Sequence, residues 1–332
     1  MSFRGVVIVL LVAICAYSSF IVLRSMHRTL PAYGRRAMTL SAELTDVHMS
    51  KLGPWYINQD SANDPRLKEA EQFAISKNGI PFFRRGDKIE PHPIAAAQYA
   101  LALYNYYIDH PTAKTRTDFL HQADWLAGYC RLGCFYNFAN PPQIYNNHWV
   151  SGMAQGEVIS VQTRAYQLTH DRRYLAAARD AFGVLKTPLE KGGPLVRTTS
   201  GTWFEEYPQF PPTHVLNGHM FALFGLWDYY KVSKDPTARA LFYEGAAAAI
   251  NGLGRSDTGY WARYDLAHMR LCNRLYMDIE ILQMRVLDEM THDHTLDAIA
   301  RRFEGYESSP YSFFRIWMHD VLHPRGLYEL QR

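Results

Sequence analysis

Hydrophobic positions recur along most of this chain at a spacing that predicts long helices arranged in pairs. Four segments are apolar around most of their circumference and end in a polar turn with Asp or His, namely 94–109, 150–171, 220–235 and 274–293. Each is followed by a segment with apolar residues on one face, namely 116–129, 172–186, 237–253 and 296–306. Such periodicity indicates helices. The sequence therefore predicts an internal repeat of four helix hairpins, spaced by roughly sixty residues.

An apolar helix followed by a one-sided helix is what an inner and an outer ring would show. We therefore expect a mainly α fold, an incomplete α/α toroid of four helix hairpins. Its long connections, 135–149, 194–213 and 255–273, would meet at one end and form a mouth. Short Val- and Thr-containing pieces at 195–199 predict a small β-hairpin there.

The chain before the helices has a different character. Residues 5–23 carry no charge and are long enough to cross a bilayer as a helix. No convincing cleavage site follows them, so we predict a single-pass membrane anchor within 1–28. A tether with an irregular or β-hairpin segment is expected over 29–90, and the toroid over 91–332. The arginines that flank the span would by themselves leave the body in the cytoplasm.

The amino-acid composition favours a sugar ligand over nucleic acid. The chain has 332 residues, 48% of them hydrophobic, which is enough for one large core or two modest ones. Its 14% aromatic fraction fits a groove that stacks sugar rings. The net charge is only +3 and no run of Lys and Arg stands out, so nothing indicates nucleic acid. Cys130 and Cys134 could form a local disulfide, but without a nearby His pair they do not make a metal site, and we expect neither metal nor cofactor.

One stretch, 203–219, concentrates unusual residues. It places Glu205, Glu206 and Tyr207 on a segment held by three prolines, directly before an apolar helix that we expect to begin at Val215. Proton-transfer groups are often found on such rigid loops. Acidic residues near a helix start are also favoured by the helix dipole, which is the plain structural interpretation.

The predicted mouth adds further chemistry to this stretch. It collects Tyr264, Tyr276, His268 and Arg274 beside the acidic pair. A carboxylate with several phenols, and no Ser/His/Asp arrangement or Gly-rich phosphate loop, narrows the chemistry to proton transfer or glycosidic cleavage. A cation can bind the carboxylate of an acidic sugar, and aromatic rings can pack against the sugar ring, so this set of residues favours an acidic sugar as ligand.

Several blocks of the sequence, in a fixed order, carry a resemblance to a known family. They are Gly79-Ile-Pro, Pro93-Ile-Ala-Ala-Ala-Gln-Tyr, Trp149-Val-Ser-Gly-Met-Ala-Gln-Gly, Trp203-Phe-Glu-Glu-Tyr-Pro, Val215-Leu-Asn-Gly, Asp257-Thr-Gly, Tyr264-Asp-Leu and Asn273-Arg-Leu-Tyr, with Gln283. This set resembles the catalytic C-terminal domain of the D-glucuronyl C5-epimerases, which turn glucuronate into iduronate within heparosan-type polymers. The resemblance covers about 79–306.

The resemblance implies proton-transfer roles for Glu206, Tyr207, Tyr264 and Tyr276. Epimerisation removes the C5 proton of a uronate and returns one from the opposite face. Our hypothesis is that Glu206 and Tyr276 face each other across the sugar, with the other two phenols near the uronate carboxylate. Candidate substrate-binding residues, each with a plainer structural interpretation as well, are Trp149, Gln155, Asn217, His268 and Arg274.

The chain also departs from the family pattern. Where the family has Tyr-His-x-x-His, this chain has Tyr276-Met-Asp-Ile-Glu280, and Ala267 stands where an Arg is expected. The β-sandwich that animal enzymes insert between the first two helices, with its calcium site, is replaced by a turn over 109–114. Two other readings therefore stay open: a uronate lyase or glycoside hydrolase on the same toroid, and an inactive glycan-binding relative.

The resemblance implies partners and a location. The expected partners are an acidic, glucuronate-containing polysaccharide and, through the N-terminal helix, a membrane; a homodimer is left open. The resemblance implies an extracytoplasmic or luminal body, against the charge bias around residues 5–23.

Overall fold

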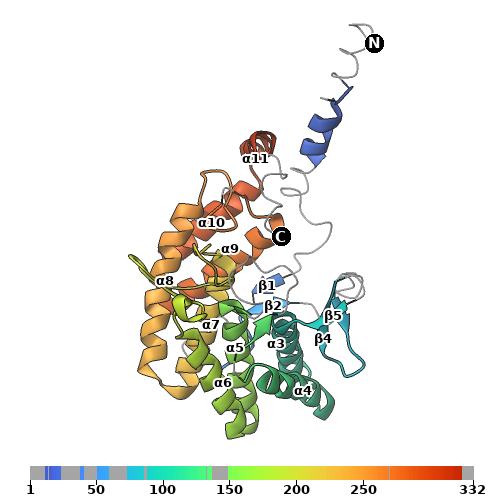
Figure 1. Ribbon diagram of the computed structural model, residues 1–332, viewed down its shortest axis with the longest axis vertical. Coiled ribbons are helices and arrows are strands. Elements are labelled where there is room, and N and C mark those ends of the chain that lie inside the picture. Colours follow the sequence, from blue (N-terminus) through green and yellow to red (C-terminus); the bar gives the residue numbers. More distant parts are fainter. Residues whose placement is uncertain are drawn as a thin grey trace.

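The protein is mainly helical (Figure 1). The computed structural model describes residues 12–13, 15–23, 38–40, 51–59, 73–85, 88–131, 133–136, 149–268 and 270–323. The prediction of a mainly helical fold built on four helix hairpins is confirmed. These hairpins are α3 (Pro93–Asp109) with α4 (Ala113–Tyr129), α5 (Gly152–Thr169) with α6 (Arg172–Leu185), α7 (Leu216–Ser233) with α8 (Pro236–Ser256), and α9 (Arg274–Thr291) with α10 (Thr295–Glu307). A further helix, α11 (Pro310–Leu322), was not predicted.

The hairpins stand side by side in chain order. The first helices α3, α5, α7 and α9 pack against one another in succession, and each packs against the second helix of its own hairpin. At the two ends of this row, α3 and α9 do not pack together as neighbouring members do. Among the described helices, the row of first helices is therefore open.

The middle of the row is packed closely enough to exclude side chains. A Cβ on Gly156 of α5 would lie 2.4 Å from the Cα of Ala222 in α7. A Cβ on Gly225 would lie 2.2 Å from the carbonyl oxygen of Gly156. Because glycine alone allows this approach, α5 and α7 form one rigid unit.

Equivalent helix ends repeat along the chain. The helices α5, α7 and α9 end at His170, Lys234 and His292, all in the left-handed conformation with φ of 58°, 60° and 56°. Asp171 and Asp235 then cap the following helices through their carboxylates. Three of the four polar turns that defined the repeat in the sequence thus share a left-handed helix end, whereas α3 ends at His110 with φ of −134°.

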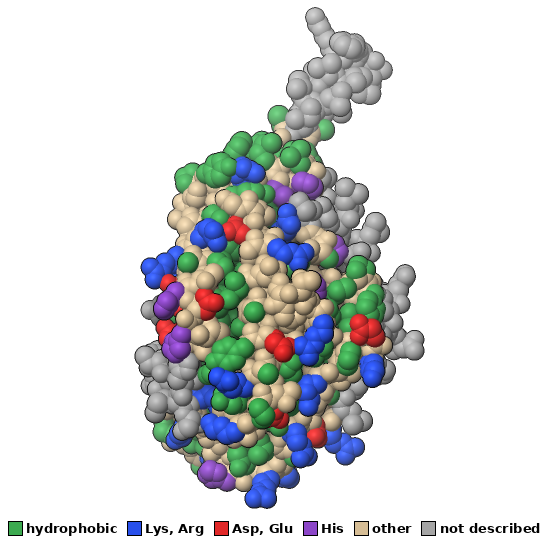
Figure 2. Space-filling model, turned by 90° about the vertical axis from the view of Figure 1, so that its left-hand side faces the viewer, with side chains coloured by type: hydrophobic (Ala, Val, Ile, Leu, Met, Phe, Trp, Pro, Cys, Tyr) green, Lys and Arg blue, Asp and Glu red, His purple; other side chains and the backbone are tan. Residues whose placement is uncertain are grey.

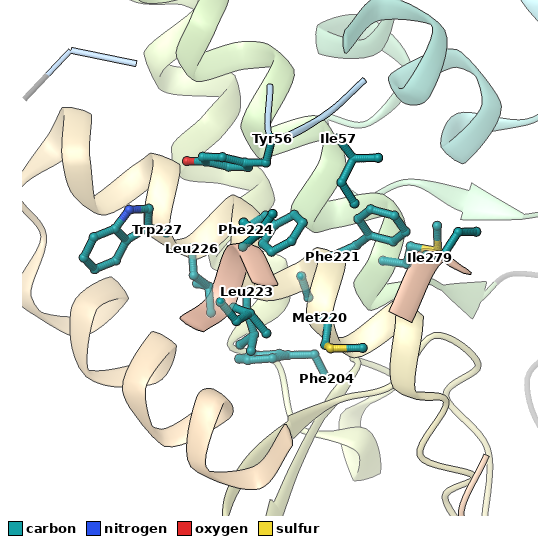
Figure 3. Close-up of a cluster of buried hydrophobic side chains, with 14 of the residues drawn as sticks. Tyr56, Ile57, Phe204, Met220, Phe221, Leu223, Phe224, Leu226, Trp227 and Ile279 are labelled. Carbon is teal, nitrogen blue, oxygen red and sulfur yellow. The ribbon is translucent and has the colours of Figure 1, made fainter. Parts of the chain in front are cut away.

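Leu52, Trp55, Tyr56 and Ile57 are buried beside the C-terminal halves of the first helices, and Figure 3 shows Tyr56 and Ile57 packed near α7. The Trp55 ring stacks on Phe221 with centroids 5.7 Å apart. The Tyr56 hydroxyl donates to Asp228 at 2.5 Å, and the same carboxylate accepts from Arg164 at 2.5 Å, all of them buried. This end of the row is therefore closed by packing, which leaves the N-terminal ends of α5, α7 and α9 for a site.

Short antiparallel β elements accompany the helices. The strands β3 (Phe73–Ile75), β4 (Pro81–Arg85) and β5 (Lys88–Pro91) form one sheet in that order. Two-stranded pairs join β1 (Met38–Leu40) to β2 (Ile57–Gln59), and β6 (Phe135–Tyr136) to β7 (Trp149–Val150). The predicted hairpin is confirmed as β8 (Leu195–Thr198) with β9 (Gly201–Phe204), in which Leu195 faces Phe204. Cys130 and Cys134 are joined by a disulfide.

The predicted membrane anchor is wrong. Within the part of the chain that the structure describes, no helix combines the length and the apolar character that crossing a bilayer requires. Of the expected span, residues 12–13 and 15–23 are described, and they are helical. The remaining residues of the expected span, 5–11 and 14, lie outside the described residues. The predicted membrane location was inferred from this span, so it is wrong as well.

The surface view shows charges of both signs spread over the face, with hydrophobic side chains gathered at the end near the N-terminal segment (Figure 2). The helix α11 lies at this end (Figure 1) and exposes Tyr311, Phe314 and Leu322. The spread of charge agrees with the small net charge of +3.

Candidate active site

The loop after β9 crosses the N-terminal ends of α5 and α7. The backbone N–H of Gly152 donates to the carbonyl of Glu205 at 2.8 Å. A Cβ on Gly218, in the first turn of α7, would lie 2.7 Å from both the Cβ and Oε2 of Glu206. The two glycines therefore let the acidic pair sit directly on the two helix ends, which favour negative charge.

The two adjacent carboxylates have different partners. Oε2 of Glu205 accepts from the His214 backbone N–H at 3.0 Å and from the Thr213 hydroxyl at 3.3 Å. Its Oε1 lies 2.5 Å from Nδ1 of His214. Glu205 is fully buried and fixes the loop that leads into α7. Glu205 therefore has a structural role in the loop, whereas the side chain of Glu206 is hydrogen-bonded by Tyr207.

Glu206 titrates close to neutral pH. Burial is the largest cause and raises its pKa to about 7, helped by the charge of Glu205. A hydrogen bond from Tyr207 and the positive charge of Arg270 act in the opposite direction. A carboxyl group with a pKa near the working pH can both accept and return a proton.

A directed chain of hydrogen bonds reaches Glu206. The Tyr264 hydroxyl donates to Tyr207, and the Tyr207 hydroxyl donates to the Glu206 carboxylate. Burial, followed by the charge of Glu206, raises the pKa of both phenols well above the usual value. Both tyrosines therefore keep their protons at neutral pH and act as donors.

Tyr276 completes this cluster from the start of α9. Its backbone N–H is capped by the side chain of Asn273 at 3.0 Å. Its ring packs edge-on against Tyr264, with centroids 4.9 Å apart and an interplanar angle of 66°. Tyr276 is partly exposed, whereas Glu206 is 6% exposed. The four residues with predicted proton-transfer roles are thus brought together from three separate segments, and their catalytic roles stay a prediction.

The connection between α8 and α9 positions Tyr264. Its backbone N–H donates to the carbonyl of Arg270 at 3.0 Å. The Arg270 guanidinium lies over the Tyr264 ring, 4.2 Å from its centroid. The buried Trp261 anchors the same loop by donating from Nε1 to the carbonyl of Cys272 at 2.9 Å. Arg270 is thus the cation beside the cluster, and sequence reasoning missed it.

Two of the candidate binding residues lie at buried helix ends. Gln155 of α5 is fully buried, and neither of its side-chain polar atoms has a hydrogen-bond partner. Asn217 of α7 is buried with Oδ1 unpartnered, and its carbonyl accepts from Gln283 of α9 at 2.9 Å. Unpaired buried polar atoms are costly, so these groups are suited to a polar ligand.

The other candidate binding residues are engaged elsewhere or only partly described. The Arg274 Nε lies 2.9 Å from Glu307 of α10, so this residue ties the last hairpin together. Nδ1 of His268 lies 3.0 Å from Asp265. Trp149 pairs its backbone with Tyr136, and its side chain is outside the described part of the structure.

Two buried carboxyls were also missed. Glu157 of α5 accepts a hydrogen bond from Gln98 of α3 at 2.9 Å. Glu280 lies one helical turn beyond Tyr276 and is fully buried, with neither oxygen hydrogen-bonded. Burial raises the pKa of both groups well above the usual value. A Glu within a strongly apolar helix was the available sequence signal.

Comparisons with known proteins identify the family to which this chain belongs. The family model for the D-glucuronyl C5-epimerase C-terminus matches residues 127–305. Over 176 residues the chain is 32% identical to the D-glucuronyl C5-epimerase of Caenorhabditis elegans, which covers 48% of this chain and 29% of that protein. An uncharacterised protein of Methanocaldococcus jannaschii is 33% identical over 162 residues, covering 48% and 52% of the two chains. The chain thus spans about half or less of the length of these relatives.

One solved structure aligns with part of the chain. A family 76 glycoside hydrolase from a bovine Bacteroides thetaiotaomicron strain aligns with a TM-score of 0.49 and 12% identity, over 69% of this chain and 50% of that one.

Proposed function

We propose, from the premise that this chain belongs to the D-glucuronyl C5-epimerase family, that it converts D-glucuronate into L-iduronate within an acidic polysaccharide. One observation carries the proposal. A carboxyl group with a pKa of about 7, Glu206, lies in a cluster with three phenols drawn from segments far apart in the sequence. Such a set provides a base and an acid for proton transfer without cleaving a glycosidic bond.

The proposed proton transfer uses the two ends of this cluster. Ionised Glu206 accepts the C5 proton from one face of the uronate, and the electron pair that is released spreads onto the uronate carboxylate. The partly exposed Tyr276 donates a proton to C5 from the opposite face. Its oxygen then regains a proton from solvent, and Glu206 releases the one it took. The enzyme thereby returns to its starting protonation state.

We assign the remaining tyrosines a role different from the one expected from the sequence. Their hydroxyls are directed along the chain that ends on Glu206. We therefore assign Tyr207 and Tyr264 to stabilising the ionised form of Glu206. Without the hydrogen bond from Tyr207, burial would raise the pKa of Glu206 further above 7.

The substrate class follows from the charge and shape of this end of the fold. Arg270 beside the cluster supplies a positive charge for a uronate, and the aromatic rings supply faces for sugar packing. The open row of helix pairs supports an incomplete α/α toroid, with the cluster at the N-terminal ends of its first helices. A glucuronate-containing polymer of the heparosan type is the proposed substrate.

Incubation with desulfated heparosan in deuterated water, followed by NMR, tests the proposal. An epimerase incorporates deuterium at C5 and forms iduronate without shortening the chain. A lyase would shorten the polymer and create an unsaturated end that absorbs ultraviolet light, and a silent glycan-binding protein would do neither. The matched control is Tyr276→Phe, which should fold normally and lose deuterium incorporation.

A further inference from the structure

Glu157 lies beside the proposed reaction site, on a different helix from Glu206. It follows Gly156, which is the point where α5 touches α7 at Ala222. One turn earlier in α7, Gly218 touches Glu206. The two carboxyls thus flank the same helix contact, and the charge of Glu206 acts on Glu157.

The surroundings of Glu157 hold it in the neutral acid form. The side chain is 1% exposed. The groups that act on it are the amide of Gln98 and the carboxylate of Glu206, and neither is a cation. A buried carboxylate without a cation is strongly disfavoured, and a second negative charge nearby disfavours it further. When Glu206 ionises near neutral pH, Glu157 therefore keeps its proton.

The contact with Gln98 decides which oxygen carries that proton. Because Nε2 of Gln98 donates to Oε1 of Glu157, this oxygen acts as the acceptor. The proton is then left on Oε2, which is buried and has no hydrogen-bond partner. A buried hydroxyl donor without an acceptor loses the full energy of its hydrogen bond, so an acceptor brought by a ligand would be bound strongly.

We propose that Glu157 is a further residue of this site that works as a neutral carboxylic acid, donating a hydrogen bond from Oε2 to an oxygen of the bound uronate. This inference rests on the proposed function for its ligand. The acceptor of the right chemistry is a carboxylate oxygen of the uronate, where negative charge builds up once the C5 proton has left. A neutral acid can donate a hydrogen bond to that oxygen, whereas an ionised carboxylate has no proton to donate and would repel it.

Infrared spectroscopy of the full chain in deuterated water tests the protonation state without any substrate. At a pH above the titration of Glu206, the carbonyl band of protonated carboxyls should lose intensity in Glu157→Gln relative to the wild type. The exposed Glu190 provides the control, because Glu190→Gln should leave this band unchanged. An unchanged band in Glu157→Gln would overturn the inference, whether or not the protein proves to be an epimerase.

Deuterium incorporation at C5 tests the role as a donor. Glu157→Gln retains a neutral donor of similar shape and should keep the rate within about 10-fold of the wild type. Glu157→Leu removes the donor and should lower kcat by about 100-fold or more, with a smaller change in KM. Wild-type kcat in Glu157→Leu, or complete loss in a folded Glu157→Gln, would contradict the donor role. If the wild type itself shows no incorporation, the proposed function fails while the infrared result still decides the protonation state.

Discussion

Gly218 lies so close to Glu206 that a Cβ at position 218 would come within 2.7 Å of the Cβ and Oε2 of the glutamate. The first turn of α7 thus packs directly against Glu206, the proposed base. Since the Cβ of Glu206 cannot move without its backbone, a side chain at 218 must displace the loop itself.

Gly218→Ala should therefore lower the rate of C5 exchange at least about 10-fold and destabilise the fold by about 1–3 kcal/mol. Gly254 in α8 is the matched control, because a Cβ there would meet nothing within 4 Å. Gly254→Ala should be neutral or slightly stabilising, since Ala is the better helix former. Exchange assays and thermal unfolding of both variants check the prediction. Wild-type exchange in Gly218→Ala would show that the loop adapts.

The hydrogen bond from Tyr207 should set the pH dependence of the reaction. Exchange requires ionised Glu206, so its rate should rise with pH through a value of about 7. Tyr207→Phe removes a donor that lowers the pKa of Glu206, so the rise should move to higher pH. Tyr243→Phe, at an exposed position of α8, serves as the control. A profile of the Tyr207 variant that overlays the wild type would remove this bond from the mechanism.

Glu206 should make the protein less stable as the pH rises. Its folded pKa of about 7 lies above the ordinary value of 4.5, so the stabilising preference for the proton is fully present below pH 4.5. It is lost between pH 4.5 and 7. At about 1.4 kcal/mol per pKa unit, Glu206→Gln should be more stable than the wild type by about 3 kcal/mol above pH 7 and equal to it near pH 4. Denaturant unfolding at several pH values measures the difference, and a constant difference would contradict the assignment.

Two neighbouring arginines should behave differently. Arg270 lowers the pKa of Glu206, so Arg270→Gln should move the rise of the exchange rate to higher pH and weaken binding of an acidic polymer. Arg274 pairs with Glu307 instead. Arg274→Gln should cost about 1–3 kcal/mol of stability and leave the pH profile in place. The pH dependence of the exchange rate, measured for both variants with heparosan, checks this prediction. A shift of the profile in Arg274→Gln but not in Arg270→Gln would show that Arg274, and not Arg270, acts on Glu206.

The buried pair of Arg164 and Asp228 should be essential for folding. Asp228→Asn leaves a buried guanidinium without its counter-charge, which should cost about 3–5 kcal/mol. The exposed pair of Lys114 and Asp118 is the control, and Lys114→Ala should leave the free energy of unfolding close to that of the wild type. Urea unfolding measures the free energy of unfolding of both variants. Equal decreases in the two would show that the buried pair contributes no more to stability than the exposed pair.

Local patterns allowed the helices to be predicted, because helix period and turn chemistry are encoded by neighbouring residues. The expected start of the helix after the acidic pair, at Val215, agrees with the structure, in which Val215 is the N-cap and α7 begins at Leu216. The expected membrane anchor was wrong, since the prediction used the uncharged composition of residues 5–23 alone and the described residues contain no helix long and apolar enough to cross a bilayer. The burial of Tyr56 could not be predicted from its neighbours, because its hydrogen-bond partner Asp228 lies 172 residues away in the sequence.

The sequence by itself determined the repeat of helix hairpins, the family blocks and the four candidate residues Glu206, Tyr207, Tyr264 and Tyr276. Only the tertiary structure decided what surrounds them: that Glu205 is tied to His214, that Arg270 and not Arg274 lies beside the cluster, and that Glu157 lies across the helix contact from Glu206. The reason is physical. A residue type and its spacing are local properties, whereas burial, the partner of a charge and the pKa that results depend on segments that meet only when the chain folds.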